Sequence, residues 1–334
     1  MEAFHQMNVL LVAEESAGVQ ALRLLSNSAH NIAGVLTTIH SPDVVVHGNI
    51  SDEIAGSGNN SLKSSVAATA ENMGVPVLDA KRVQDAGFTT WIASQHIDVL
   101  LNVHSLYRIC PEVIQEVQVG AFNLHPGPLP GYSGLNIPSW AVYNEETTHA
   151  VTLHHITEKI DAGDIVYESQ FPLTLTDTGL TVSIKCVQKG MLLIERLLNA
   201  LSREPLSIPS RPQTLSDRTF YKRNVIPVNG YIEWSAPAHK IDAYVRACNY
   251  SPFPSPWGEP KTRWGNSEIS ILKTTLSNKL CREVPGTIGR MIDGKTAIAT
   301  ADHWLLIDRC KVDGDNRVAA TFLNQGDLLT SSFK

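Results

Sequence analysis

Asparagine, histidine and aspartate can together transfer an acyl group. Candidates for all three lie in two segments of this sequence. Asn123 and His125 alternate at the end of an apolar run, so on a strand both side chains leave the same face. Asp161 stands further along the chain, just before a glycine turn. An amide N–H and an imidazole N–H can stabilise the oxyanion formed when an amine attacks a carbonyl carbon, and a carboxylate favours the charged imidazole. These three residue types therefore suit acyl transfer to an amine.

The segment after His125 is suited to close contact with a bound molecule. Residues 126–134 read PGPLPGYSG, with three prolines and three glycines. Proline stiffens such a loop, and glycine lets the backbone approach a ligand closely. Ligands of open α/β sheets bind at the carboxyl ends of the strands, so this loop marks the candidate site.

Two other chemistries are open to the same region. A metal-dependent hydrolase could use His125, His154 and His155 as ligands, but the pleat of a strand points His154 and His155 to opposite faces. A hydrolase triad could use His104 and Ser105 with Asp161, but no GxSxG motif surrounds Ser105. We predict no metal site.

The elements that must position these residues follow an alternating pattern. Apolar runs typical of buried strands lie at residues 8–13, 32–36, 75–78, 99–103 and 121–124, and helical patterns lie at 19–25, 62–73, 82–95 and 179–201. This alternation predicts a Rossmann-like, mostly parallel α/β sheet. The turn after the first strand has no GxGxxG and carries Glu14 and Glu15, so it does not predict a dinucleotide site.

The pattern changes in the last third of the chain. Residues 1–204 are the predicted catalytic domain, residues 205–229 a proline-rich linker, and residues 230–334 a C-terminal domain. In this last domain Ser235 can cap a helix over 236–248. Short β-like runs at 268–272, 286–291, 296–300 and 304–310 predict a small, OB-like antiparallel β-barrel.

Composition narrows the class of protein. The 334 residues are 43% hydrophobic and carry a formal charge of −6, which excludes a disordered chain and counts against a broad nucleic-acid surface. The five cysteines form no CxxC pair, so reduced thiols are expected. No apolar run is long enough to cross a bilayer and no signal peptide is recognisable, so we expect no membrane association and a cytoplasmic location.

The candidate residues lie in two motifs that resemble the folate-dependent formyltransferase family, which includes methionyl-tRNA formyltransferase. These are FNLHPGPLPGYSG at residues 122–134 and HAVTLHHITEKIDAGDIV at residues 149–166. The family's catalytic Asn, His and Asp match Asn123, His125 and Asp161 in type, order and spacing. GYIEW at 230–234 resembles the start of the family's C-terminal domain, so the similarity covers nearly the whole chain.

The resemblance implies an N-formyltransferase that uses 10-formyltetrahydrofolate as co-substrate. Asn123 and His125 would hold the formyl oxygen, and Asp161 would set the protonation of His125 and help to move a proton. Two segments would form the folate slot. They are Tyr107, Arg108 and Ile109, and Thr157, Glu158, Lys159 and Ile160.

Departures from the family pattern bear on the acceptor. Ser133 replaces the common arginine of the loop, Leu135 replaces a second one, and residues 40–65 are acidic where tRNA enzymes are basic. Nucleic acid is therefore not an expected partner. We expect a primary amine of a small or carrier-bound metabolite, with a carrier protein as a candidate partner.

Other readings of the resemblance stay open. The acceptor could be a nucleotide-linked amino sugar, because FYKR at 220–223 resembles the linker of sugar formyltransferases, or it could be methionyl-tRNA. A folate-binding protein without turnover is the non-enzymatic alternative. The C-terminal domain could bind the acceptor, form a homodimer or brace the core.

Overall fold

The computed structural model describes residues 5–39 and 65–331. The acidic stretch at 40–64 and the first residues of the helix expected at 62–73 lie outside these ranges. Within them, no helix is both long and apolar enough to cross a membrane. All five cysteines carry free thiols, and only Cys110 is not fully buried.

A seven-stranded sheet organises the first part of the chain, in the order β3-β2-β1-β4-β5-β7-β8. The strands are β1 (Asn8–Ala13), β2 (Asn31–Thr37), β3 (Val77–Asp79), β4 (Val99–Val103), β5 (Gly120–His125), β7 (Thr148–His155) and β8 (Ile165–Pro172). Neighbours from β3 to β5 run parallel, and β5 pairs with β7 antiparallel. The predicted mostly parallel α/β sheet is confirmed.

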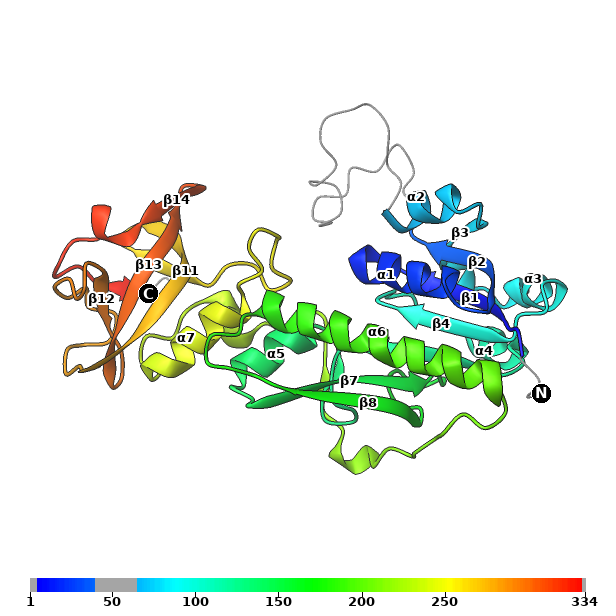
Figure 1. Ribbon diagram of the computed structural model, residues 1–334. Helices are drawn as coiled ribbons and strands as arrows, with labels where there is room; N and C mark the ends of the chain where they lie inside the picture. The colour runs from blue at the N-terminus through cyan, green and yellow to red at the C-terminus, as the bar shows by residue number, and fades with distance from the viewer. Residues whose placement is uncertain (1–4, 40–64, 332–334) are drawn as a thin grey trace. The chain divides into compact units, whose positions relative to one another are not determined.

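Helices cover both faces of this sheet (Figure 1). On one face α1 (Glu15–Ser26), α2 (Ser65–Asn72) and α6 (Gly179–Arg203) bury residues such as Leu22 and Ile194 against Leu11, Leu101 and Phe122. On the other face lie η1 (Ala80–Gln84), η2 (Ala86–Phe88), α3 (Thr89–Ser94) and α4 (Pro111–Glu116). Strands buried on both faces explain the continuous apolar runs of the sequence.

The single helix predicted over residues 82–95 is wrong. Two short 3₁₀ turns precede α3, because aspartate side chains cap each of them. Asp79 accepts the N–H of Lys81 at 2.9 Å, and Asp85 accepts the N–H of Gly87 at 2.8 Å. Such side-chain bonds compete with the continuous hydrogen-bond ladder of an α-helix.

The C-terminal part contains α7 (Ala238–Ala247) and a six-stranded sheet in the order β12-β13-β11-β10-β15, with β14 on β13. Its strands are β10 (Lys261–Trp264), β11 (Ser267–Leu280), β12 (Thr296–Ala299), β13 (His303–Val312), β14 (Asp315–Val318) and β15 (Leu329–Thr330). All of these pairings are antiparallel and the sheet curls into a half-barrel, which confirms the expected OB-like domain.

Two local expectations in this part are wrong. Residues 286–291 form only isolated bridges, at Thr287 and Ile288, rather than a strand. The helix expected from 236 begins at Ala238, with Pro237 at its N-cap. Ser235 does not cap it, because its hydroxyl donates to the carboxylate of Glu233 instead.

The described chain folds into two compact units that interleave along the sequence. The first comprises the segments up to Gly134, His149–Phe171 and Ile184–Phe220. The second comprises Leu135–Thr148, Pro172–Ser183 and the segments from Tyr221 onward, and includes α5 (Ile137–Tyr143) and α7. The consecutive division at 204 and 230 stays a prediction.

Candidate active site

Strand β5 carries two of the candidate residues to the edge of the sheet. Phe122 and Leu124 are buried in the core that α6 covers, and the residues that alternate with them, Asn123 and His125, leave the opposite face. His125 is 3% exposed, whereas Asn123 is only partly buried. The alternation of the sequence therefore holds in three dimensions.

Asp161 lies beside His125. Its Oδ1 is 3.6 Å from Nδ1 of His125 and 3.7 Å from Nε2 of His154, and its Oδ2 accepts the N–H of Gly134 at 2.8 Å. The carboxylate is 8% exposed. All three predicted catalytic residues thus gather at one end of the sheet, together with His154.

The turn that presents Asp161 is held in an unusual conformation. Asp161 has a φ of +52°, which few residues other than glycine adopt. The side-chain amide of Gln213 donates to the carbonyls of Asp161 at 3.1 Å and Gly163 at 2.6 Å. A Cβ on Gly163 would lie 1.9 Å from the carbonyl oxygen of His155, so only glycine fits there.

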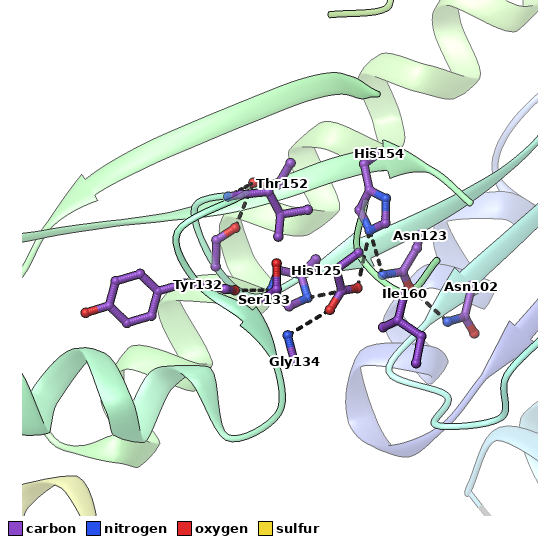
Figure 2. Close-up of polar contacts among 12 residues, drawn as sticks. Asn102, Asn123, His125, Tyr132, Ser133, Gly134, Thr152, His154 and Ile160 are labelled. Atoms are coloured by element: carbon purple, nitrogen blue, oxygen red, sulfur yellow. Dashed lines mark hydrogen bonds and ion pairs between the residues drawn. The ribbon is translucent and has the colours of Figure 1, made fainter. Parts of the chain in front are cut away.

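The proline-rich loop is pinned to β7 by side-chain hydrogen bonds. The hydroxyl of Thr152 donates to the carbonyl of Gly127 at 2.7 Å. The Nε2–H of His149 donates to the carbonyl of Pro126 at 3.0 Å. The loop in turn offers the carbonyl of Tyr132 to Nε2 of His125 at 2.6 Å (Figure 2). Because a carbonyl only accepts, Nε2 of His125 carries the proton and Nδ1 faces Asp161.

Burial sets the charge states of this site. Burial lowers the pKa of His125 from its usual value and outweighs the opposing effects of Asp161 and of the Tyr132 carbonyl. Burial alone would raise the pKa of Asp161, but the positive charge that His125 and His154 carry when protonated, together with the N–H of Gly134, holds it well below its usual range. The resting pair is therefore a neutral imidazole beside an ionised carboxylate.

Part of the predicted folate slot lines a cavity of about 260 Å³. Arg108, Glu158, Lys159 and Ile160 line it. The guanidinium of Arg108 donates to the carbonyl of Glu158 at 3.1 Å, so the two predicted segments meet. Ile160 is 48% exposed and directly precedes Asp161, which connects the cavity to the catalytic residues.

The other three predicted folate residues do not line this cavity. Ile109 is buried in the core beneath the sheet. The hydroxyl of Tyr107 lies 3.4 Å from that of Thr38. Thr157 donates to the carbonyl of Lys159 at 3.0 Å, and so shapes the loop rather than the cavity wall.

Sequence reasoning missed one cation of the site. Arg218 and Phe220 complete the cavity, and the guanidinium of Arg218 lies 4.8 Å from the ring centroid of Phe220. Arg218 also donates to the carbonyl of Ile160 at 2.7 Å and approaches the hydroxyl of Ser133 at 3.4 Å. A cation therefore lies against the loop at the position where the sequence has serine. Arg218 lies in the predicted proline-rich linker, where no pattern of the sequence indicated this contact.

Two further polar residues stand beside Asn123. Asn102 of β4 and His154 of β7 lie directly opposite it on the neighbouring strands. Asn102 donates to Asn123 at 2.8 Å, and Asn123 contacts Nε2 of His154 at 3.0 Å (Figure 2). The sequence held one indication of this role, because Asn102 is the polar residue of the otherwise apolar run VLLNV at 99–103.

The histidine pair of β7 splits between the two faces of the sheet. His154 faces Asn123, whereas His155 packs on Phe122 with ring centroids 4.8 Å apart. In the described ranges, 5–39 and 65–331, no group of three or more His, Cys, Asp or Glu side chains could hold a metal ion.

Known proteins are similar to this chain in sequence and in architecture. The Formyl transferase family profile matches residues 19–197, and the Formyl transferase, C-terminal domain profile matches residues 224–327. The methionyl-tRNA formyltransferase of Bacteroides fragilis is 26% identical over 335 residues, which cover 98% of this chain and 97% of that protein.

Two solved structures share the fold. The N-formyltransferase of Helicobacter canadensis, in complex with folinic acid and dTDP-3-aminofucose, matches 90% of this chain and 98% of its own, with a TM-score of 0.63 and 18% identity. HypX of Aquifex aeolicus, in complex with tetrahydrofolic acid, matches 96% of this chain and 47% of its own, with a TM-score of 0.56 and 17% identity. With both profiles matched in order along its length, the chain belongs to the formyltransferase family.

Proposed function

We propose that this chain is an N-formyltransferase that moves the formyl group of 10-formyltetrahydrofolate to a primary amine. The observation that carries the proposal is the meeting of Asn123, His125 and Asp161 at one end of the sheet, with a neutral imidazole beside an ionised carboxylate. This arrangement supplies an amide donor and a proton acceptor in a largely buried site, which acyl transfer to an amine requires.

Each residue has a separate task in this proposal. The amide N–H of Asn123 donates to the formyl oxygen as negative charge grows there. Nδ1 of His125 takes the proton that the attacking amine must lose, and Asp161 stabilises the imidazolium that results. The protonated Nδ1 then offers an N–H to the reacting oxygen or to the departing nitrogen.

The cavity beside Ile160 fits the proposed co-substrate. It combines exposed apolar surface from Ile160 and Phe220 with the cations Arg108, Lys159 and Arg218, and these suit a flat aromatic molecule with an acidic tail. When bound, 10-formyltetrahydrofolate supplies an activated formyl carbon. Arg108 and residues 158–160 would hold it at the cavity wall, and Thr157 would keep their loop in shape.

For the acceptor we propose the amine of a small or carrier-bound metabolite. Ser133 and Leu135 leave the loop itself without a charged side chain. A nucleotide-linked amino sugar is the second candidate, because Arg218 lies against Ser133 and because a structurally similar protein was solved with such a sugar. Methionyl-tRNA is the third, on the strength of the curated relative.

The test is a tetrahydrofolate-release assay on the full chain. Purified protein is incubated with 10-formyltetrahydrofolate and, in separate reactions, with aminoacyl carrier proteins, nucleotide amino sugars and methionyl-tRNA. Mass spectrometry then identifies the formylated product. Binding of tetrahydrofolate without release in any reaction would favour the folate-binding protein over the enzyme.

A further inference from the structure

We propose that Asn102 is a positioning residue that fixes the orientation of the Asn123 carboxamide for formyl transfer. The inference rests on the proposed function for its kinetic consequence. Its structural part, a row of hydrogen bonds across three strands, stands on geometry alone.

The row crosses the sheet from β4 through β5 to β7. Asn102, Asn123 and His154 occupy directly opposed positions on β4, β5 and β7. Asn102 is 8% exposed and His154 is 2% exposed, so water cannot readily replace their hydrogen bonds. The row therefore constrains Asn123 from both sides.

The two ends of the row fix the direction of every hydrogen bond in it. Nδ2 of Asn102 lies 3.3 Å from the carbonyl oxygen of Ser105, and Nδ1 of His154 lies 2.8 Å from the carbonyl oxygen of His155. Carbonyl oxygens only accept, so both nitrogens must donate.

These two donors determine which atoms donate and which accept in the middle of the row. Nδ2 of Asn102 gives its second N–H to Oδ1 of Asn123 at 2.8 Å. Nδ2 of Asn123 gives an N–H to the unprotonated Nε2 of His154 at 3.0 Å. The 3.7 Å between His154 and Asp161 is too long to compete with this bond.

This direction matters for the proposed reaction. With its oxygen turned toward Asn102, Asn123 keeps its second N–H for a substrate oxygen. The reversed carboxamide would turn its oxygen toward His154 and offer no donor there. Oδ1 of Asn102 has no partner among the described residues, so Asn102 contributes to this site as a donor alone. Asn102 thus acts through Asn123 rather than on the substrate.

The decisive variant is Asn102→Asp, which keeps the shape of the side chain and replaces its donors with acceptors. A carboxylate there would face Oδ1 of Asn123 and turn that carboxamide over. We expect kcat to fall by about 10², as on loss of one oxyanion donor, with the KM for 10-formyltetrahydrofolate within about twofold of the wild-type value.

A pH series separates positioning from simple damage. Below its pKa the introduced carboxyl group regains an O–H that can donate to Asn123. The ratio of variant to wild-type kcat should therefore rise as the pH falls. The surrounding titratable groups are His104 with its partner Glu15, His125, His154 and Asp161. The introduced carboxylate interacts with them, so Asn102→Ala, which adds no titratable group, is the reference series in which kcat should not recover at low pH.

The chain offers a matched control at the opposite end of the sheet. Nδ2 of Asn31 on β2 donates to Oδ1 of Asn8 on β1 at 2.9 Å, which is also an asparagine pair between neighbouring strands. Asn31→Asp breaks that pair away from the site, so its kcat should stay at the wild-type value at every pH.

A second readout needs no turnover. In ¹⁵N-labelled protein the N–H···N bond between Asn123 and His154 should give a coupling between the two nitrogens, which Asn102→Asp abolishes at neutral pH. Wild-type protein that releases no tetrahydrofolate would refute the proposed function, yet this coupling would still report on the row.

Three results would overturn the positioning role of Asn102. They are an Asn102→Asp protein with unchanged kcat, a loss of kcat that does not recover at low pH, and a nitrogen coupling that survives the substitution. If Asn102→Asp does not fold, Asn102→Ala takes its place. It should lower kcat by about tenfold without recovery at low pH, and an unchanged kcat would overturn the proposal.

Discussion

The imidazole of His125 donates its Nε2–H to the carbonyl of Tyr132 at 2.6 Å, and this bond leaves Nδ1 facing Asp161 at 3.6 Å. The proline-rich loop therefore determines which nitrogen of His125 can exchange a proton at the site. A rigid loop is needed for this task because a small shift of the Tyr132 carbonyl would release the ring.

Replacement of Asn123 should remove one donor from the site. We expect Asn123→Ala to lower kcat by about 10²–10³, because the growing charge on the formyl oxygen loses its amide partner. The variant also leaves Nδ2 of Asn102 and Nε2 of His154 without their partner, so the melting temperature should fall as well, and kcat is measured where both proteins are folded. Steady-state tetrahydrofolate release and thermal unfolding check this, and wild-type turnover in the variant would contradict the assignment.

Removal of the carboxylate should shift the pH profile as well as the rate. Asp161 raises the pKa of His125, against the dominant effect of burial. Asp161→Asn should therefore lower that pKa further, move the acid limb of kcat/KM to lower pH, and reduce kcat by about 10². The full pH profile of both proteins is the measurement. An acid limb at its wild-type position would show that Asp161 does not act through His125.

The buried His149 should make the folded protein sensitive to mild acid. Burial lowers the pKa of His149 from 6.5 to about 4. As the pH falls, His149 therefore takes up a proton near pH 6.5 in the unfolded chain but only near pH 4 in the folded chain. The contribution of neutral His149 to the free energy of unfolding is fully present above pH 6.5. About 3 kcal/mol of it is lost as the pH falls from 6.5 to 4.

Urea unfolding across this pH range tests the role of His149. His149→Phe keeps a ring between Tyr132 and Phe171, whose centroids lie 5.9 Å and 5.6 Å from it, and should flatten the acid slope. His96→Asn, at an exposed histidine, is the control and should leave the slope unchanged. Equal slopes in the wild type and His149→Phe would refute the assignment.

A methyl group on Gly163 should disturb the turn that carries Asp161. With the carbonyl of His155 only 1.9 Å from the added Cβ, the backbone must move. We expect Gly163→Ala to cost about 2 kcal/mol or more and to lower kcat, because Asp161 moves with the turn. Gly131→Ala, whose Cβ would meet no atom closer than 3.9 Å, is the stability control. Denaturant unfolding compares the two.

The parts of the fold that follow from local pattern were predictable from the sequence. The run at 99–103 matches β4, and the alternation of Asn123 and His125 on an apolar background located the end of β5. These signals work because burial on one or two faces dictates the residue pattern directly. The helix expected at 82–95 failed because capping by Asp79 and Asp85 overrode helical periodicity.

The parts of the site that depend on distant neighbours were not predictable from pattern. Asn102 owes its place to strand register, which sets Asn102, Asn123 and His154 side by side. Arg218 reaches Ile160 from a segment with no regular periodicity. A single sequence does not encode such pairings in any local property.

The segment after α6 has a consequence for truncation and for chimeric enzymes. Gln213 donates to the backbone carbonyls of Asp161 and Gly163, and Arg218 donates to the preceding carbonyl of Ile160. A fragment that stops at residue 204 would keep all three acyl-transfer residues and still lose these tethers. In a chimeric enzyme, the junction should therefore lie after Phe220, so that only the residues that follow come from the other protein.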